Sequence, residues 1–419
     1  MNYLCSKPGR VFPAILAALL FLVPAVVLYA QQGSGKLLDA RNAGRKSVAE
    51  IHELAKPMFD IYGVPDLQYA AVEYRLAFKT TDFDGTPVTA YARLFVPAPA
   101  LESGGEYPLL VFGSGTTGVG DHCAPSLEDP SVRRWGHYEA NMLSYAANGI
   151  ITVFPDYVGF NDAMRPQRYF SKYAEGHLML DTARAVRKFF ESRREDAVLG
   201  KLFLAGYSQG GHAAFSAADL RAEYAPEITI SGIVSYGGTM NVETLLREGS
   251  YYAPFIFYTY EHMYGTERVN PEEYLMNRWM ETFETDVLSM SVDQFQRYYP
   301  FDGTLLYDPD FYSALMNDRL AAEYPGLKAA LDENIAGLSG HGVPALIIQG
   351  SRDVIITTTE QDKYVSLLCE RGSAVEYLVL DQVRHRFTRA AGFRATLEWM
   401  DKIVAGEQAP SNCSDIRSR

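Results

Sequence analysis

The sequence contains little cysteine and none of the short motifs that commonly hold a metal ion. Four cysteines are spread over 419 residues, and neither a Cys-x-x-Cys pair nor a His-Glu-x-x-His segment occurs. Metal sites in proteins are often built on such closely spaced ligands. We therefore expect no metal site, and no other pattern in the chain predicts a cofactor.

Positive charge is also scarce. The chain has 38 Lys and Arg residues against 51 Asp and Glu residues, which gives a formal net charge of −13. Binding to nucleic acid requires a basic surface, and charge-driven adsorption to anionic lipid requires one too. The composition argues against both, while 47% hydrophobic and 21% charged residues are ordinary values for a globular enzyme. Internal repeats and low-complexity tracts are absent from the sequence.

Only one apolar run is long enough to cross a membrane, and it lies at the N-terminus. Residues 11–30 carry no charge and follow ten residues that contain basic but no acidic side chains. This pattern is typical of an export signal, so we expect a secreted or periplasmic protein from which residues 1–30 are removed. The run exceeds most signal cores, so the alternative is an uncleaved helix that anchors the protein in the membrane. Pro13 and Pro24 weaken that helix and favour cleavage.

An exported chain would fold in an oxidising environment, where cysteines form disulfides. Cys5 would leave with the signal, and three cysteines would remain. We expect a bond between Cys369 and Cys413, because both lie in the C-terminal third and the bond would attach the C-terminal tail, residues 410–419. The pairing of Cys123 stays open.

Short apolar runs recur along the chain and are separated by segments whose apolar residues recur every three or four positions. The runs are residues 107–113, 150–155, 201–206, 228–238, 344–350 and 374–380. Nearly continuous apolar strands that alternate with helices predict a mostly parallel central sheet with helices on both faces, an α/β fold. Before these runs, residues 71–82 and 88–97 alternate around Asp84 and Gly85, which predicts an antiparallel hairpin.

The alternation of strands and helices stops in one long segment. Residues 240–340 contain many Tyr and Met residues, no clear strand, and helix-like pieces such as residues 272–283. We expect a helical lid or cap here, inserted into a core formed by residues 31–239 and 341–409. Its aromatic side chains would form the core of the insertion, line a substrate site, or do both.

Residues 206–210 have the form Gly-x-Ser-x-Gly and lie between an apolar run and a helix-like segment. A serine on such a sharp turn projects its hydroxyl away from the sheet at a helix N-terminus, where developing negative charge is stabilised. Side chains at Gly206 and Gly210 would clash with the neighbouring strand and helix. We predict that Ser208 is a nucleophile and that Gly206, Tyr207 and Gly210 shape its turn.

A serine nucleophile needs a histidine base and a carboxylate that orients the histidine. His385 follows the last predicted strand, at the sheet edge where the loops of a parallel sheet converge on a site. Asp353 follows the strand before it, and Asp381, which lies four residues from His385, is the rival. We expect His212, one helical turn after Ser208, to pack beside the turn. The order Ser208, Asp353, His385 is that of α/β-hydrolases.

A loop of small residues follows the run 107–113 and can stabilise an oxyanion through its backbone. Residues 113–118 also match the Gly-x-Gly-x-x-Gly pattern of dinucleotide sites, but such a site needs a helix that opens on these glycines. The polar, Pro-containing sequence that follows predicts a loop instead. We expect the backbone N–H groups of Gln209, Gly115 and Thr116 to form the oxyanion hole.

Four segments together resemble the secretory lipases of the α/β-hydrolase superfamily. They are GSGTTGVGDHCAPS (113–126), PDYVGF (155–160), AEGHLMLDTARAVRKF (174–189) and GYSQGGHAA (206–214). The resemblance implies an α/β-hydrolase fold with a helical lid between the sixth and seventh core strands, where residues 240–340 fall. It also implies hydrolysis of triacylglycerols or simpler esters. The chain has Ser114-Gly115-Thr116 where the family commonly has His-Gly-Thr, a departure within the oxyanion loop.

We therefore expect a secreted serine hydrolase that cleaves carboxylic esters through an acyl-enzyme, with an ester or lipid as its substrate. A lipase is the first expectation and a short-chain carboxylesterase the second. A peptidase or amidase with the same triad is one alternative, and a non-catalytic binding protein with a hydrolase fold is another. The acyl-chain preference and the oligomeric state are left open.

Overall fold

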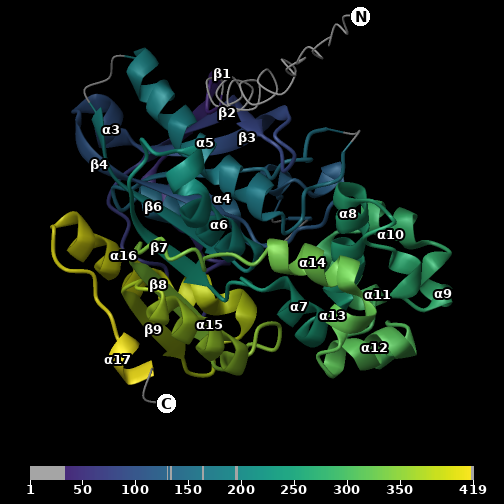
Figure 1. Cartoon of the computed structure of the whole chain (residues 1–419). Helices are drawn as coiled ribbons and strands as arrows, with labels where there is room; N and C mark the ends of the chain where they lie inside the picture. Colours follow the sequence, from purple (N-terminus) through teal and green to yellow (C-terminus); the bar gives the residue numbers. More distant parts are fainter. Residues whose placement is uncertain (1–33, 130, 133–134, 163–164, 194–196, 417–419) are drawn as a thin grey trace, which may run out of the picture.

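The computed structural model of the protein describes residues 34–129, 131–132, 135–162, 165–193 and 197–416 (Figure 1). The expected export signal or anchor, residues 1–30, lies outside these ranges. Within the ranges, every helix is too short or too polar to span a membrane.

The described chain forms one sheet of nine strands, in the order β1-β2-β3-β5-β4-β6-β7-β8-β9. The strands are β1 (Leu37–Lys46), β2 (Ala71–Thr81), β3 (Pro87–Pro97), β4 (Gly105–Gly113), β5 (Ile151–Pro155), β6 (Ala197–Tyr207), β7 (Ile230–Tyr236), β8 (Ala345–Gly350) and β9 (Val375–Leu380). Strands β1, β2, β3 and β5 pair in antiparallel fashion, and the remaining pairs are parallel. The mostly parallel sheet and the hairpin β2–β3 confirm the predicted architecture.

Strand β1 was not predicted from the sequence. Its residues are mostly exposed, and the pairing with β2 shifts register between Asn42 and Gly44, where Gly44 has a φ of +121°. A polar edge strand with such an irregularity lacks the alternation that makes a buried strand recognisable.

Helices cover both faces of the sheet (Figure 1). The α-helices are α2 (Val48–Ala55), α3 (Ala98–Glu102), α4 (Tyr138–Ala146), α5 (Lys172–Arg193), α6 (Gln209–Tyr224), α7 (Val242–Glu248), α8 (Ala253–Tyr264), α9 (Asn277–Met280), α10 (Phe283–Ser289), α11 (Val292–Tyr298), α12 (Pro309–Met316), α13 (Leu320–Glu323), α14 (Pro325–Glu333), α15 (Thr358–Glu370), α16 (Thr388–Val404) and α17 (Cys413–Ile416). Short 3₁₀ turns are η1 (Asp121–Cys123), η2 (Pro125–Leu127), η3 (Ser250–Tyr252), η4 (Pro271–Glu273), η5 (Gly303–Leu305) and η6 (His385–Phe387).

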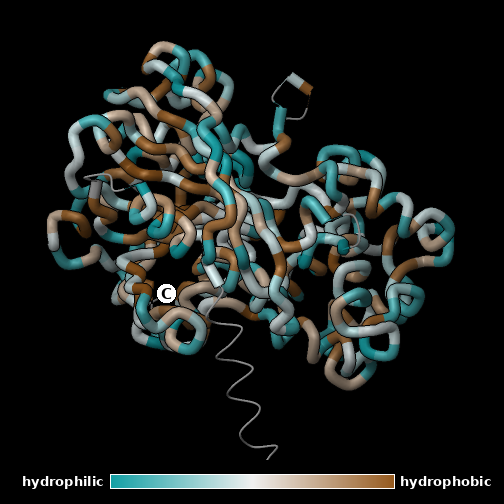
Figure 2. The backbone as a smooth tube through the Cα atoms, turned by 90° about the horizontal axis from the view of Figure 1, so that it is seen from above, coloured by the Kyte–Doolittle hydropathy of each residue, from teal (hydrophilic) through white to brown (hydrophobic). Residues whose placement is uncertain are grey.

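The central strands are apolar on both sides because each face carries its own hydrophobic core. In β4, Leu109 and Val111 face the core shared with α5, α6 and α15, while Leu110 and Phe112 face the core shared with α2, α4 and α16. Figure 2 shows the apolar backbone segments concentrated in the middle of the molecule. This two-sided burial explains why the strands read as continuous apolar runs.

Helices α7 to α14 gather beside the sheet and have a third core of their own (Figure 1). Aromatic rings fill it, for example Phe255 stacked on Phe295 with ring centroids 3.7 Å apart. The segment 272–283 is not one helix, as its pattern indicated. It is divided among η4, α9 and the first residue of α10, because the N–H of Met276 donates to the carbonyl of Leu306 in a short antiparallel bridge.

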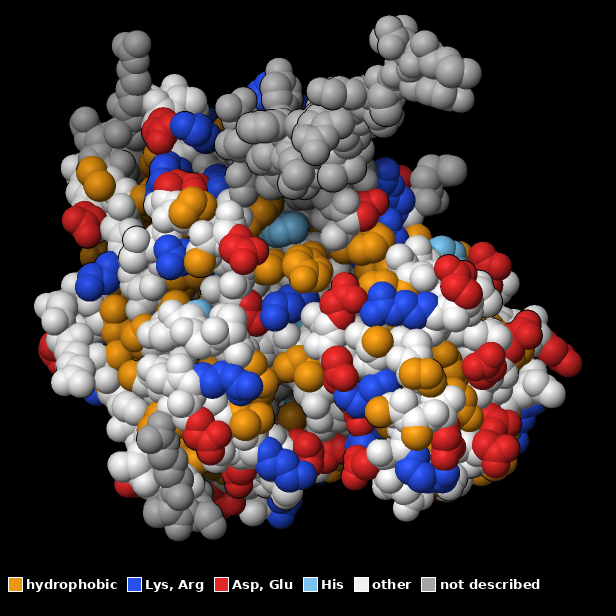
Figure 3. Space-filling model, in the orientation of Figure 1, with side chains coloured by type: hydrophobic (Ala, Val, Ile, Leu, Met, Phe, Trp, Pro, Cys, Tyr) orange, Lys and Arg blue, Asp and Glu red, His pale blue; other side chains and the backbone are white. Residues whose placement is uncertain are grey.

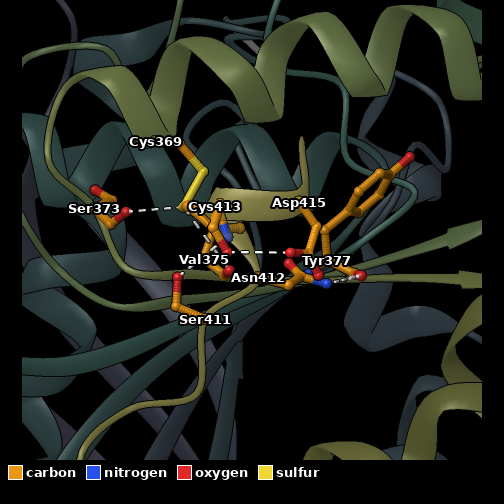
Figure 4. The surroundings of a disulfide bond; sticks show 9 residues. Cys369, Ser373, Val375, Tyr377, Ser411, Asn412, Cys413 and Asp415 are labelled. Carbon is orange, nitrogen blue, oxygen red and sulfur yellow. Dashed lines mark hydrogen bonds between the residues drawn. A yellow bond between two sulfur atoms is a disulfide. The ribbon is translucent and has the colours of Figure 1, made fainter. Parts of the chain in front are cut away.

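The structure joins Cys369 and Cys413 by a disulfide, with their Cα atoms 5.7 Å apart (Figure 4). The bond attaches α17 to the end of α15. Next to it, Asn412 pairs with strand β9, because its side chain accepts from the N–H of Tyr377 and donates to the Tyr377 carbonyl, both at 3.0 Å. Cys123 takes no part in this bond, and its thiol lies 3.3 Å from Nε2 of His122.

Lys and Arg side chains are interspersed with Asp and Glu on the face seen in Figure 3, without an extended basic patch there.

Candidate active site

Ser208 lies on the turn between β6 and α6 in a conformation that few residues adopt. Its φ is 53° and its ψ is −113°, a strained combination for a residue with a side chain. Its N–H donates to the carbonyl of Tyr236 at 3.0 Å. A Cβ on Gly206 would lie 2.0 Å from the carbonyl of Gly210, and one on Gly210 would lie 1.9 Å from the carbonyl oxygen of Gly113. The two glycines therefore allow the strand, turn and helix to approach this closely.

Asp353 and His385 come together at the same end of the sheet. Nδ1 of His385 lies 2.7 Å from Oδ2 of Asp353, and Oδ1 of Asp353 accepts from the N–H groups of Ile355 and Ile356 at 2.9 and 3.0 Å. Because a carboxylate accepts, Nδ1 carries the proton and Nε2 presents a lone pair, as in a general base. The rival carboxylate, Asp381, is exposed in the loop after β9.

The imidazole of His385 lies against the residues that flank Ser208. A Cβ on Gly237 would be 2.9 Å from Nδ1 of His385, and the Tyr207 and His385 rings have centroids 5.0 Å apart. Nε2 of His385 is buried and has no hydrogen-bond partner among the described residues, so the hydrogen bond to Ser208 is not formed here. Hydrogen bonds of this kind are often long before substrate binds.

The loop after β4 runs without helix from Ser114 to Gly118, as expected. The expected oxyanion donors in this loop differ in their present hydrogen bonding. The N–H of Gly115 donates to the hydroxyl of Tyr138 at 2.8 Å, which leaves this amide occupied. Within the described chain the N–H of Thr116 has no acceptor, and Gln209 is the first residue of α6, whose N–H has no partner within the helix. The amides open to a ligand are therefore those of Thr116 and Gln209.

Tyr138 is a site residue that the sequence did not reveal. Its ring is fully buried beside Arg389, whose guanidinium lies 5.0 Å from the ring centroid, and burial raises the pKa of the Tyr138 hydroxyl. The hydroxyl therefore stays neutral and can accept from Gly115. The side chain comes from α4, far in sequence from the loop that it supports, so no local pattern could point to it.

A second buried carboxylate, Glu175, lies behind the nucleophile turn. One oxygen accepts from Nε2 of Gln209 at 2.7 Å, and the other lies 2.6 Å from Nδ1 of His212. Nε2 of His212 lies 2.7 Å from the carbonyl oxygen of Asn334. His212 is thus packed beside the turn, and it pairs with a residue of α5 that sequence spacing did not connect to the site.

Tyr252, in η3, lies near Tyr207 and Asp353 of the candidate site. Tyr252 is 5% exposed. Burial raises the pKa of Tyr252 well above its ordinary value, and the nearby Tyr251 hydroxyl adds to the shift. Ser208 itself is 6% exposed. Ser208 is therefore buried, and Tyr252 near the site stays neutral.

Side chains suited to a metal ion do not cluster anywhere in the described ranges: no group of three or more His, Cys, Asp or Glu residues is placed to hold one.

Comparison with known proteins identifies the family. The model of the secretory lipase family matches residues 137–412. The secreted triacylglycerol lipase LIP4 of Malassezia globosa is 25% identical over 365 residues, which cover 82% of this chain and 75% of that protein.

Two solved structures share the fold. The rice cell wall degrading esterase LipA from Xanthomonas oryzae has a TM-score of 0.70 at 20% identity, over 89% of this chain and 97% of that one. Candida antarctica lipase A has a TM-score of 0.64 at 20% identity, over 91% of this chain and 84% of that one. With an α/β-hydrolase fold and a family match over more than half of its length, the chain belongs to the secretory lipase family and is a carboxylic ester hydrolase.

Proposed function

We propose that the protein hydrolyses carboxylic esters through an acyl-enzyme formed on Ser208. In this mechanism Oγ of Ser208 attacks the ester carbonyl while Nε2 of His385 takes its proton, and Asp353 holds the imidazole in the productive tautomer. The protonated His385 then passes the proton to the leaving alcohol. Water, activated by the same histidine, releases the acid and restores the serine.

The backbone N–H groups of Gln209 and Thr116 are the proposed donors to the tetrahedral oxyanion. One lies at the start of α6 and the other in the loop after β4, and neither has to break a hydrogen bond to bind substrate. Fixed donors of this kind stabilise charge that develops only in the transition state.

One observation supports the proposal more strongly than any other. The buried Nε2 of His385 has no partner among the described residues, while Asp353 holds its Nδ1 at 2.7 Å and the strained Ser208 lies on the adjoining turn. A buried polar atom without a partner is costly, so such atoms are often reserved for catalysis.

We infer the substrate class from the side chains of the insertion. We assign residues 240–340 to a cap whose tyrosines and apolar side chains suit an acyl or aromatic ester better than a charged substrate. The same cap must move or open for substrate to reach a serine that is 6% exposed. A lipase is the first choice and a short-chain esterase the second, and the family supports release from the cell as its location.

The test is labelling with a fluorophosphonate probe, which reacts with an activated serine. The wild type and a control variant, Ser144→Ala in buried α4, should label equally, and Ser208→Ala should not label. Labelling that survives in Ser208→Ala would contradict the proposal by assigning the nucleophile to another residue, and no labelling of the wild type would favour a non-catalytic binding protein.

A chain-length series then separates the substrate classes. Hydrolysis of p-nitrophenyl esters that falls steeply beyond butyrate assigns an esterase, whereas activity on long acyl chains and emulsified triacylglycerol assigns a lipase. Cleavage of a peptidyl-nitroanilide at a rate close to that of the best ester would instead assign a peptidase.

A further inference from the structure

We propose that the buried pair Glu175–His212 positions the oxyanion hole. In this proposal the Glu175 carboxylate fixes Gln209, and His212 prevents that carboxylate from placing a net negative charge behind the oxyanion. The inference rests on the proposed function, because it takes the N–H of Gln209 as an oxyanion donor.

Glu175 holds the side-chain amide of Gln209. The side chain of Gln209 is fully buried, its Nε2 donates to Glu175 at 2.7 Å, and its Oε1 has no partner among the described residues. The contact with Glu175 is therefore the one polar contact that orients this side chain within the described chain. Because the same residue carries the proposed donor N–H, Glu175 restricts the motion of the amide that must meet the oxyanion.

The hydrogen bonds of the pair fix its proton content. The carbonyl of Asn334 can only accept, so Nε2 of His212 carries a proton. Nδ1 lies 2.6 Å from Oε2 of Glu175, and a second proton must lie between these atoms, since two lone pairs at that distance would repel. Either the histidine is protonated and the glutamate ionised, or both are neutral. In both cases the net charge of the pair is zero.

Neutrality matters because of where the pair lies. Glu175 and His212 are 1% and 0% exposed, so water does not screen them. A lone carboxylate within hydrogen-bonding distance of the Gln209 side chain would repel an oxyanion bound to the Gln209 amide, and the low dielectric of the interior strengthens this repulsion. His212 removes that charge while the carboxylate keeps its orienting hydrogen bonds.

The pair also connects the nucleophile turn to the insertion. Asn334 follows α14, and besides its carbonyl contact with His212, its side chain accepts from the N–H of Lys172 at 2.8 Å and donates to the hydroxyl of Tyr264 at 2.7 Å. Glu175 also accepts from the N–H of Phe170, which has a φ of 53°. The strained Phe170 turn is thus bound by Glu175, which also holds Gln209, and the residue that follows α14 is bound by His212.

The experiment compares three variants on a soluble p-nitrophenyl ester: H212A, E175Q and the double variant E175Q/H212A. In E175Q the amide oxygen still accepts from Gln209, and the amide nitrogen donates to a neutral His212. In H212A an uncompensated carboxylate remains. In the double variant no charge remains, although the cavity left by the imidazole is still there.

We expect H212A to lower kcat by about 10- to 100-fold, less than the ~10²- to 10³-fold cost of removing an oxyanion donor, with KM changed less than about threefold. E175Q should lower kcat by less than about fivefold, and the double variant should be at least about fivefold faster than H212A. A purely structural role predicts the opposite for the double variant, which loses two sets of contacts and should be as slow as H212A or slower.

Phe215→Leu is the matched control, because Phe215 is buried on the same helix and outside this network. It should lower the melting temperature and leave kcat near that of the wild type. If H212A does not fold, H212Q and E175Q/H212Q replace it, with the same ratio expected between them. Wild-type kcat in H212A or H212Q, or no recovery on adding E175Q, overturns the inference. Such a result with Ser208→Ala still inactive would leave the proposed function intact, whereas an active Ser208→Ala would remove both.

Discussion

Two carboxylate–histidine pairs are buried in this molecule, and they differ at one atom. Asp353 holds His385 at 2.7 Å, and Glu175 holds His212 at 2.6 Å. Nε2 of His385 has no partner among the described residues, whereas Nε2 of His212 donates to a backbone carbonyl. A histidine bound by a carboxylate can serve as a base only where its second nitrogen is left for substrate. The same pairing is therefore suited to two uses, and we propose a chemical one for His385 and a structural one for His212.

The elements that carry the pairs account for the difference. Asp353 and His385 lie in loops at the carboxyl ends of β8 and β9, where the sheet ends and a substrate can approach. Glu175 and His212 lie within α5 and α6, away from the sheet edge, and both nitrogens of His212 have partners.

Removing one histidine at a time should give the largest difference in kcat between the two pairs. We expect His385→Ala to lower kcat by about 10⁵- to 10⁶-fold, because the proposed serine loses its base. His212→Ala should lower kcat far less, as argued above. Steady-state kinetics on one ester gives both values, and equal losses in the two variants would refute the division of roles.

The carboxylates give the next largest contrast. Asp353→Asn should lower kcat by about 10⁴-fold, because the amide favours the wrong imidazole tautomer. The corresponding change Glu175→Gln leaves a neutral pair with its hydrogen bonds in place, so kcat should fall only slightly. If Asp353→Asn retained most of the activity, Asp353 would not be the orienting carboxylate, and Asp381→Asn would be the variant to examine.

His177 extends the comparison to a partly buried histidine whose ring stacks on Tyr224, with centroids 3.9 Å apart. Burial lowers the pKa of His177 from 6.5 to about 4. Between pH 6.5 and about 4 the imidazole of His177 is protonated in the unfolded chain and not in the folded chain. The free energy of unfolding therefore falls as the pH drops. From pH 7 to 4.5 the wild type should lose about 2 kcal/mol relative to His177→Phe.

Denaturant titrations of both proteins at several pH values measure this loss. Asp181, whose pKa burial raises to about 6, acts in the opposite direction, since its contribution to stability falls as the pH rises through that range. It is present in both proteins and cancels in their difference. Parallel stability curves for the two proteins would contradict the assignment to His177.

The smallest effect is expected at the oxyanion loop. Tyr138→Phe removes the hydroxyl that accepts from Gly115 and should cost about 1 kcal/mol of unfolding free energy. Because we assign no donor role to Gly115, kcat should stay within about threefold of the wild type. A rise in kcat well beyond that would mean that the freed amide joins the oxyanion hole after all.

Features encoded over short stretches of the sequence were predicted well. The central parallel strands are buried on both faces and bounded mostly by glycine or proline, and the predicted runs fall within a few residues of β4 to β9. The turn at Ser208 was visible because its two glycines are sterically required.

Features that depend on distant contacts were not predictable. Edge strand β1 carries a polar sequence, and the 272–283 segment forms a bridge to Leu306 and Tyr307 instead of a continuous helix. The occupied amide of Gly115 depends on a hydroxyl from α4, and the pairing of His212 depends on a carboxylate 37 positions away. A sequence pattern identifies what a residue can donate or accept, but only packing decides which partner it meets.

The fastening of the C-terminal tail has a consequence for solubility. Strand β9 is an edge strand of the sheet. The unpaired backbone groups of an exposed edge allow another molecule to add a strand. Asn412 occupies part of that edge by bonding to Val375 and Tyr377, and the Cys369–Cys413 bond keeps it there. We therefore expect the tail to reduce self-association by blocking part of the β9 edge. Light scattering of Cys413→Ser should rise with protein concentration, and an unchanged signal would show that β9 needs no such protection.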